Sequence, residues 1–153
     1  MATHSSFHTL PCFCYGSLRS PPVLKMLFGQ TQFASSPAFL PHFKCIYLKD
    51  KMYPGIISHP LSNTPGIILK RKGYTGVFKE DLHILDHFEG VEENAYIRQL
   101  VWIHNQITHQ KQQAWVYGLG ESLKANVTDR EWHFEKVDEW VQNQGGWTLF
   151  FEE

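Results

Sequence analysis

The chain has 153 residues, 42% of them hydrophobic and 19% charged, with a formal net charge of −1. This composition excludes a disordered chain, and the near-neutral balance lacks the basic surface of proteins that bind nucleic acids or anionic membranes. We therefore expect a single domain over residues 1–153, with residues 1–10 as a candidate for disorder, a small-molecule substrate, no nucleic acid and no membrane.

The beginning of the chain and the cysteines bear on its location. The N-terminal sequence has neither the basic start nor the hydrophobic stretch of a secretory signal. Three cysteines, an odd number, fit reduced thiols better than a disulfide framework. Cys12 and Cys14 flank Phe13 on a predicted strand, where buried, inert thiols are expected. The prediction is a cytoplasmic protein.

The first half of the chain reads as short elements separated by turns. An apolar strand over 11–15 enters a glycine turn at Gly16, and a brief helix over 21–28 follows, with Ser20 as its cap and two prolines in its first turn. Apolar, β-branched or aromatic segments bounded by Pro, Gly, Ser and Asn then predict four strands. Their ranges are 43–48, 53–57, 66–69 and 75–78.

The second half contains the two longer predicted helices. The first covers 79–89, with Leu85 on its apolar face. A hairpin follows, with strands over 96–104 and 114–119. Thr128 and Glu131 form a capping-box pattern, which predicts a last helix from Thr128 to the Gly145-Gly146 pair. Many short strands and few helices predict an α+β fold, a small mixed β-barrel with a few flanking helices.

Two segments point to chemistry. Residues 13–18 read FCYGSL, a strand that ends in a tight glycine turn whose backbone N–H groups can attract an anion or a polarised carbonyl. Residues 85–90 read LDHFEG, which puts the Glu89 carboxylate in the last turn of a helix, before its predicted terminator Gly90. A negative charge there opposes the helix dipole, so the pKa of Glu89 rises if the site is also dry. Together these segments suggest proton transfer on an amide or similar carbonyl.

Other kinds of site find little support. The sequence has no phosphate-binding glycine loop, no dinucleotide fingerprint, no HExxH, no GxSxG and no CxxC pair. His83 and His87 stand four residues apart on one helix face and could share a metal, but a third ligand is not evident, so a structural or surface role is favoured. Ser17 fits a hydrogen-bonding role better than that of a nucleophile.

These segments, in their order and spacing, resemble the gamma-glutamylcyclotransferase-like family, in particular its plant avirulence-induced and fungal subgroup. The resemblance covers the chain from Phe13 to about Trp140. It rests on the segments YGSL at 15–18, YPGI at 53–56, LDHFEG at 85–90, YIR at 96–98 and WVY at 115–117. Two departures, the extra acidic pair Glu92-Glu93 and the basic run at 70–72, suggest a different pocket entrance.

The resemblance implies a small β-barrel with flanking helices and a cofactor-free cyclotransferase, an acyltransferase without a metal. It implies that Glu89 is the catalytic residue, acting as general base and then general acid. The substrate's own α-amine would attack its side-chain carbonyl and release 5-oxoproline and a free amine. The loop from Tyr15 to Ser20 would bind the gamma-glutamyl portion of the substrate. The residues of that loop are Tyr15, Gly16, Ser17, Leu18, Arg19 and Ser20.

Two further residues are candidate substrate contacts. Arg98 can pair with a substrate carboxylate or tie Asp86 and its helix to the barrel, and the second role is favoured because its strand begins soon after that helix. Tyr117 can present its hydroxyl to the pocket or belong to the core. We expect Glu89 at the rim of a pocket whose opposite wall is the 15–20 loop. Gly16 is expected there for close approach of a ligand or for a positive φ.

Two other classes of function stay open. A repurposed family member could use the same glutamate for a different cyclisation, elimination or isomerisation of an apolar substrate in fungal specialised metabolism, which the 14% aromatic content fits. A non-catalytic binding module could keep the barrel without turnover. An exposed Glu89 with no cavity beside it would favour the binding module. The sequence names neither the amine half of the substrate nor the oligomeric state.

Overall fold

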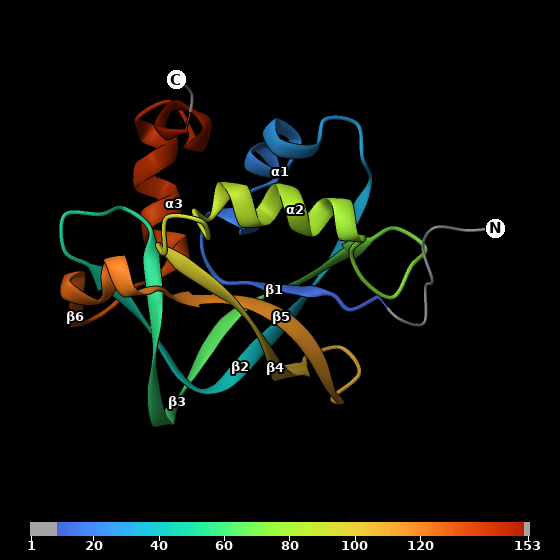
Figure 1. Ribbon diagram of the computed structural model, residues 1–153, viewed down its shortest axis with the longest axis horizontal. Helices are drawn as coiled ribbons and strands as arrows, with labels where there is room; N and C mark the ends of the chain where they lie inside the picture. Colours follow the sequence, from blue (N-terminus) through green and yellow to red (C-terminus); the bar gives the residue numbers. More distant parts are fainter. Residues whose placement is uncertain (1–8, 152–153) are drawn as a thin grey trace.

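The fold is a β-barrel with helices on one side (Figure 1). The computed structural model describes residues 9–151. Disorder was expected for residues 1–10, and of these, residues 1–8 lie outside the described residues. Strands β3-β1-β5-β4-β2 pair in this order, β2 pairs back with β3 to close the barrel, and β6 adds to β2. The strands are β1 (Cys12–Cys14), β2 (Phe33–Leu48), β3 (Pro54–Arg71), β4 (Tyr96–Asn105), β5 (Lys111–Leu119) and β6 (Val127–Glu131). The predicted α+β barrel is confirmed.

Within residues 9–151, three α-helices and three short 3₁₀-helices flank the barrel. The α-helices are α1 (Pro21–Phe28), α2 (Lys79–Phe88) and α3 (Phe134–Asn143), and the 3₁₀-helices are η1 (Ser17–Arg19), η2 (Glu121–Asn126) and η3 (Trp147–Phe150). In Figure 1 the α-helices lie above most of the strands, and the far end of the long ribbon formed by β2 and β3 lies at the bottom of the view. The predictions for α1, α2 and the β4–β5 hairpin are confirmed to within a few residues.

Strands β2 and β3 form a ribbon far longer than the three short predicted strands it contains. Serines and prolines interrupt its apolar pattern, for example Ser35-Ser36-Pro37 in β2 and Ser62 to Pro65 in β3. β2 pairs with β4 through only Ala38 and Phe39, so much of the ribbon has an open edge, where a proline costs no ladder hydrogen bond. Because this composition is typical of turns, the sequence did not predict the full length of β2 and β3, which form through their pairing with each other.

The predicted strand over 75–78 is wrong. These residues form the irregular segment before α2. The Val77 N–H donates to the carbonyl of Leu10 at 3.0 Å, and a Cβ on Gly76 would lie 2.3 Å from the Leu10 backbone. The segment's backbone is therefore pressed against the chain entering β1, where the Val77 bond and side-chain hydrogen bonds between Thr75 and Thr9 take the place of a ladder.

The predicted helix start at Thr128 is also wrong. Residues 127–131 are the edge strand β6, whose Val127 pairs with Leu48 of β2. The Thr128 hydroxyl donates to the carbonyl of Tyr47 at 2.6 Å and accepts from the Arg130 N–H at 3.2 Å, so its local backbone contact is made within a strand and not at the start of a helix. Helix α3 begins later, at Phe134, and Val137 and Val141 are buried on its inner side. Strand pairing overrode the local capping pattern.

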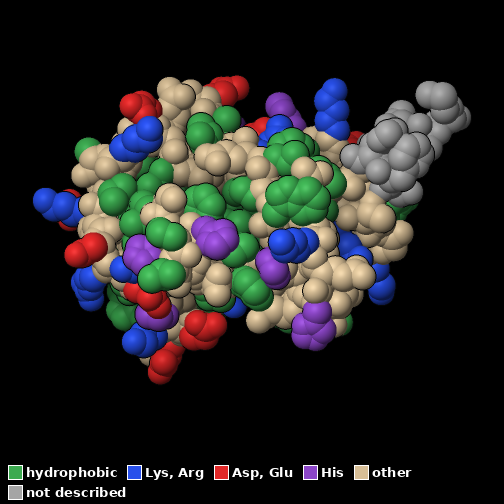
Figure 2. Space-filling view, turned by 90° about the horizontal axis from the view of Figure 1, so that it is seen from below, with side chains coloured by type: hydrophobic (Ala, Val, Ile, Leu, Met, Phe, Trp, Pro, Cys, Tyr) green, Lys and Arg blue, Asp and Glu red, His purple; other side chains and the backbone are tan. Residues whose placement is uncertain are grey.

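The barrel interior and the helix contacts form one continuous hydrophobic core. Its largest fully buried side chains include Trp147, Phe13 and Leu40. All three cysteines are buried and free, and burial raises the pKa of the Cys45 thiol, as expected of inert thiols. On the face seen in Figure 2, apolar side chains lie among acidic and basic side chains. Across residues 9–151, no helix has the length and apolar character needed to span a membrane.

Candidate active site

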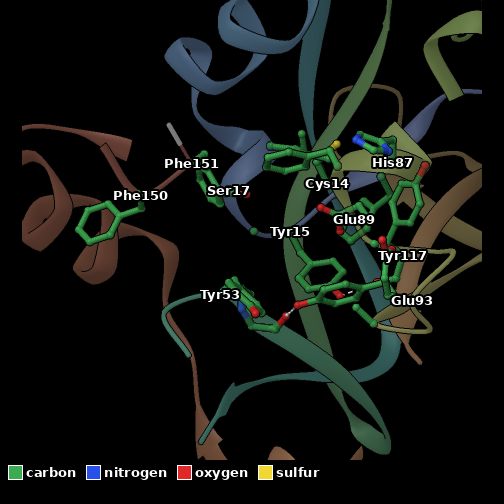
Figure 3. A pocket seen from close by; sticks show the side chains of 18 residues that line it. Cys14, Tyr15, Ser17, Tyr53, His87, Glu89, Glu93, Tyr117, Phe150 and Phe151 are labelled. Carbon is green, nitrogen blue, oxygen red and sulfur yellow. Dashed lines mark hydrogen bonds between the residues drawn. The ribbon is translucent and has the colours of Figure 1, made fainter. Parts of the chain in front are cut away.

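A pocket of about 590 Å³ opens where the end of β1, the end of α2 and residues 150–151 meet (Figure 3). Its volume lies in the range of roughly 300–1,000 Å³ typical of small-molecule sites. Both segments singled out in the sequence contribute to it. Its lining residues are Phe13, Cys14, Tyr15, Gly16, Ser17, Leu18, Tyr53, Pro54, His87, Phe88, Glu89, Gly90, Glu93, Ala95, Tyr96, Tyr117, Phe150 and Phe151.

The loop after β1 brings unpaired backbone donors to this pocket. Residues 17–19 form the single turn η1, in which Arg19 N–H donates to Gly16 O at 3.0 Å and Ser20 N–H to Ser17 O at 2.9 Å. Within the described part of the chain, the N–H groups of Gly16, Ser17 and Leu18 donate to no protein acceptor. All three residues line the pocket, so these donors are available to an anionic or carbonyl oxygen.

The conformation of Gly16 differs from one of the two expectations. Its φ is −116°, so a left-handed backbone is not the reason for glycine. A Cβ at this position would lie 3.2 Å from Cδ of Pro54, which belongs to the YPGI segment at the start of β3. The close neighbour in the structure is therefore the opposite pocket wall, and close approach of a ligand stays a prediction.

The last two residues of the predicted substrate loop do not line the pocket. Arg19 instead lies over the Phe134 ring, 4.4 Å from its centroid, and pairs with Glu135 of α3 at 3.5 Å. Ser20 directly precedes α1 at the N-cap position, but its side chain caps nothing, and its buried Oγ has no hydrogen-bond partner in the described structure. Pro21 and Pro22 lack N–H groups, and Val23 N–H is already bonded to the Ser20 carbonyl, so no capping donor remains.

Glu89 stands at the C-terminus of α2. Gly90 follows with a φ of +66°, the left-handed conformation that ends a helix, as predicted. Desolvation of the Glu89 carboxyl raises its pKa to about 8, while part of the side chain faces the pocket. Across residues 9–151, no group hydrogen-bonds or ion-pairs with this carboxyl. A carboxyl with such a pKa can both accept and donate a proton near neutral pH.

Arg98 does not reach the pocket, and the structural alternative describes it. Its Nε donates to Asp86 Oδ1 at 2.9 Å, and its guanidinium lies 4.5 Å from the centroid of the Trp115 ring. Tyr117 does line the pocket, but its hydroxyl donates to the same Asp86 oxygen at 2.7 Å. Strands β4 and β5 therefore both hold α2 through Asp86, three residues before Glu89.

Helix α2 is fixed at its other end by a buried carboxylate. Asp81, 1% exposed, accepts two hydrogen bonds from Arg71 of β3, at 2.9 and 2.7 Å. Its Oδ2 also accepts from the Phe78 N–H at 2.8 Å, which satisfies a donor at the helix N-terminus. Asp81 and Asp86 thus set the position from which Glu89 enters the pocket.

Several pocket residues were not predicted as site residues. Tyr53 and Tyr96 belong to the quoted YPGI and YIR segments, so a signal existed for them. The Tyr96 hydroxyl donates to the carbonyl of Pro54 at 2.5 Å, which joins two walls of the pocket. Phe150 and Phe151 come from the last described residues, and no sequence pattern pointed to them.

The His83–His87 pair has a mixed outcome. His87 lines the pocket, and both side chains are exposed on α2. Within residues 9–151, no group of three or more His, Cys, Asp and Glu side chains is arranged to hold a metal ion.

Most of the segments that form the pocket match those of a known protein family. A family model described as Gamma-glutamyl cyclotransferase, AIG2-like matches residues 12–141. The chain belongs to this family. The match includes the 15–18 loop, β3, α2 with Glu89, and the β4–β5 hairpin, whereas Phe150 and Phe151 lie beyond it.

Curated relatives and solved structures agree with this membership. AIG2-like protein C of Arabidopsis thaliana is 32% identical over 131 residues, which cover 86% of this chain and 69% of that protein. AIG2-like protein A of the same plant is 29% identical over 136 residues, covering 89% and 76%. A solution structure from Arabidopsis thaliana has a TM-score of 0.70 at 24% identity, covering 98% and 84%. A structure titled gamma-glutamyl cyclotransferase has a TM-score of 0.62 at 16% identity, covering 93% and 83%; these two structures support the fold.

Proposed function

We propose that this AIG2-like family member is a gamma-glutamylcyclotransferase that converts a gamma-glutamyl amide into 5-oxoproline and an amine. The observation that carries the proposal is one pocket holding a desolvated carboxyl, Glu89, beside three unpaired N–H groups. The carboxyl supplies proton transfer, and the N–H groups supply stabilisation of an oxyanion or of the substrate α-carboxylate.

The reaction forms one bond and breaks another within a folded substrate. The substrate α-nitrogen attacks the side-chain carbonyl carbon and forms the five-membered ring. The resulting tetrahedral oxyanion collapses and breaks the amide C–N bond to the amine half. Because nucleophile and carbonyl belong to one molecule, a pocket that holds them in register supplies much of the acceleration.

Glu89 moves the protons in this scheme. An α-amino group has a pKa of roughly 7.7–8.0, so it is largely protonated at neutral pH and cannot attack until it loses a proton. The Glu89 carboxylate accepts this first proton and passes it to the leaving nitrogen. After attack it accepts a second proton from the ring nitrogen and passes that one on as well. The amine half therefore departs as an ammonium group, and Glu89 returns to its carboxylate form. Since the pKa of Glu89 is about 8, these transfers run between groups of similar affinity for protons.

The direct test measures 5-oxoproline by liquid chromatography after the full chain is incubated with a panel of gamma-glutamyl amides. We expect release of equal amounts of 5-oxoproline and free amine without added metal or cofactor. If every panel member remains intact, while the protein is folded by circular dichroism, the cyclotransferase proposal is wrong.

A second candidate function is a different acid–base reaction on an apolar substrate, as in a repurposed family member. It is favoured by a specific feature of the pocket: among the described residues no Lys or Arg side chain lines it, so a substrate carboxylate would depend on backbone N–H groups and on the His87 side chain. Glu89 would again transfer the proton. This candidate predicts no 5-oxoproline from any gamma-glutamyl amide. The position of Glu89 beside a cavity speaks against the binding module.

The rate of the proposed reaction should depend on pH in a way set by Glu89. The free enzyme needs the carboxylate form, and desolvation raises its pKa to about 8. Below that value kcat/KM should fall by about tenfold per pH unit, and above it the acid limb should level off. The check is a pH profile of 5-oxoproline release between pH 5 and 9.5, with circular dichroism at each pH. An acid limb near pH 4.5, the ordinary value for Glu, would show that the base is not desolvated.

A further inference from the structure

A second cavity, of about 490 Å³, opens between β2 and β4. Its lining residues include Leu40, Pro41, Phe43, Trp102, His104 and Lys111, and none of its lining residues belongs to the candidate active site. The active-site pocket contains Tyr96, the first residue of β4. Trp102 stands six residues after Tyr96. At about 3.3 Å per residue this is roughly 20 Å along the strand, so the two cavities are separate.

The second cavity lies where the ladder between β2 and β4 stops. The last pair joins Phe39 to His104, and no further pair joins these strands in the described part of the chain. Two residues along, Pro41 would face Trp102, but proline has no N–H to donate. His42 follows with a φ of +68°, at an irregularity in the register between β2 and β3. The two strands therefore separate at this point.

One wall of the second cavity is apolar and partly open to solvent. Leu40 is buried and Phe43 is half-buried, whereas Trp102 is 59% exposed. The indole of Trp102 is thus held in the wall by its strand while most of its surface faces water. A flat apolar ligand would remove this surface from water without first displacing a packed side chain.

The polar side chains of the second cavity are basic. Lys111 directly faces His104 in the pairing of β4 with β5, so these two side chains are neighbours on one face of the hairpin. Within residues 9–151, Lys111 takes part in no salt bridge. The His104 ring stacks on Phe39 with centroids 4.8 Å apart, which fixes its plane. An ammonium group and an imidazole N–H are therefore available to an anion here.

The surrounding sequence carries no opposing charge. The adjoining parts of β2, β3 and the β4–β5 hairpin are residues 37–44, 57–65 and 100–114, which contain two lysines and four histidines but no Asp or Glu. Lys44, the second lysine, donates to the carbonyl of Asp129 in β6 and does not line the cavity. The view from below in Figure 2 shows histidine side chains among apolar ones. This local charge attracts an anion and disfavours a cation.

We propose that the second cavity binds a small aromatic carboxylate. The aromatic ring lies against Trp102 and Phe43, and the carboxylate lies beside Lys111 and His104. Charge complementarity selects this ligand class, and the exposed indole supplies the apolar contact. The proposal is independent of the cyclotransferase function, because the two cavities share no lining residue.

The first experiment is calorimetric titration of the full chain with three ligands that share one ring system. These are naphthalene-2-carboxylate, naphthalene-2-carboxamide and 2-naphthylmethylamine. We expect the carboxylate to bind at least about threefold more tightly than the amide and to lose this advantage at high salt, where exposed charges are screened. Equal affinities, a preference for the amine, or no binding of the carboxylate at low millimolar concentration would overturn the proposal.

The second experiment locates the carboxylate group through its lysine. Lys111→Gln should lower the ratio of carboxylate to amide affinity by at least about threefold. The matched control is Lys136→Gln, because Lys136 is an exposed lysine of α3 that lines neither cavity. Its ratio should equal the parental one. An unchanged ratio in Lys111→Gln would contradict the assigned position of the carboxylate.

The third experiment locates the ring. Trp102→Ala should weaken binding of the carboxylate and the amide alike, by at least about fivefold. Trp140→Ala is the control, because Trp140 is 52% exposed on α3 and lines neither cavity. Undiminished binding by Trp102→Ala would overturn the proposal. So would a dimer, detected by sedimentation, that forms through Trp102 and binds no carboxylate.

Proton–nitrogen NMR spectra give a readout that does not depend on the affinity of a variant. The indole N–H signal of Trp102, identified by its absence in Trp102→Ala, should shift on addition of naphthalene-2-carboxylate, and that of Trp140 should stay in place. If Trp102→Ala does not fold, the affinity ratio of Lys111→Gln decides. A ligand that shifts only the backbone signals of residues 16–18 would be in the active-site pocket, which would contradict the proposal.

Discussion

Glu89→Gln should lower kcat/KM for 5-oxoproline release by about 10²–10⁴-fold, the range typical of losing a general acid–base group. The amide keeps the shape of the side chain and cannot take up a proton. Substrate should still bind, because the unpaired N–H groups of the 15–18 loop are untouched. Initial rates at pH 8, together with binding of the intact amide measured by calorimetry on the variant, separate chemistry from binding.

The matched control is Glu93→Gln, the same substitution at a second carboxylate that lines the same pocket. Glu93 is exposed, so its carboxylate is solvated and unsuited to act as the base. We expect a change of less than about tenfold in kcat for this variant. Comparable losses in the two variants would indicate a general electrostatic effect, and near-parental turnover by Glu89→Gln would remove Glu89 from the mechanism.

Glu89→Gln should also make the protein more stable at alkaline pH. The folded-state pKa of Glu89, about 8, lies above the ordinary value of 4.5 that the unfolded chain has. Ionisation therefore favours the unfolded state: the penalty is absent below pH 4.5, grows as pH rises, and is complete above about pH 8. The stability gain of the variant should follow this course in urea titrations at pH 4, 6 and 8.5. A gain that is the same at all three pH values would contradict burial as the cause of the shift.

Asp81→Ala should produce the largest loss of stability, about 2–4 kcal/mol in the free energy of unfolding. The substitution removes two hydrogen bonds from Arg71 and one from the Phe78 N–H, and it leaves the half-buried guanidinium without its buried partner. A loss of this size lowers the melting temperature by roughly 4–16 °C for a protein of this length. Urea unfolding followed by tryptophan fluorescence measures it.

Asp129→Ala is the control for Asp81→Ala. Asp129 is an exposed aspartate of β6, and its substitution should change stability by less than about 0.5 kcal/mol. Activity adds a second readout, because Asp81 fixes the start of the helix that ends at Glu89. The remaining folded Asp81→Ala protein should show lower kcat than the parent. A stability loss under about 1 kcal/mol would mean that the Arg71–Asp81 pair contributes little.

The sequence by itself determined the features that depend on local chemistry. The double proline at 21–22 begins α1, and Gly90, with its positive φ, ends α2 just after Glu89. A glycine turn after the apolar β1 predicted a loop with free backbone donors, and such donors are present at residues 16–18. These features follow from the conformational preferences of a few adjacent residues, so a single sequence is enough to predict them.

The tertiary structure alone decided features that depend on partners distant in the sequence. Residues 127–131 carry a helix-capping pattern, yet they form β6 because the edge of β2 offers hydrogen bonds to them. Arg98 was a candidate substrate contact until its strand placed it against Asp86. The sequence suggested a raised pKa for Glu89 from the helix dipole if the site is also dry; desolvation by the assembled walls is the cause of the shift to about 8, and only the tertiary structure decides that the site is dry. Phe150 and Phe151 reach the pocket only because α3 and η3 return the chain to α2, a contact that no local pattern specifies.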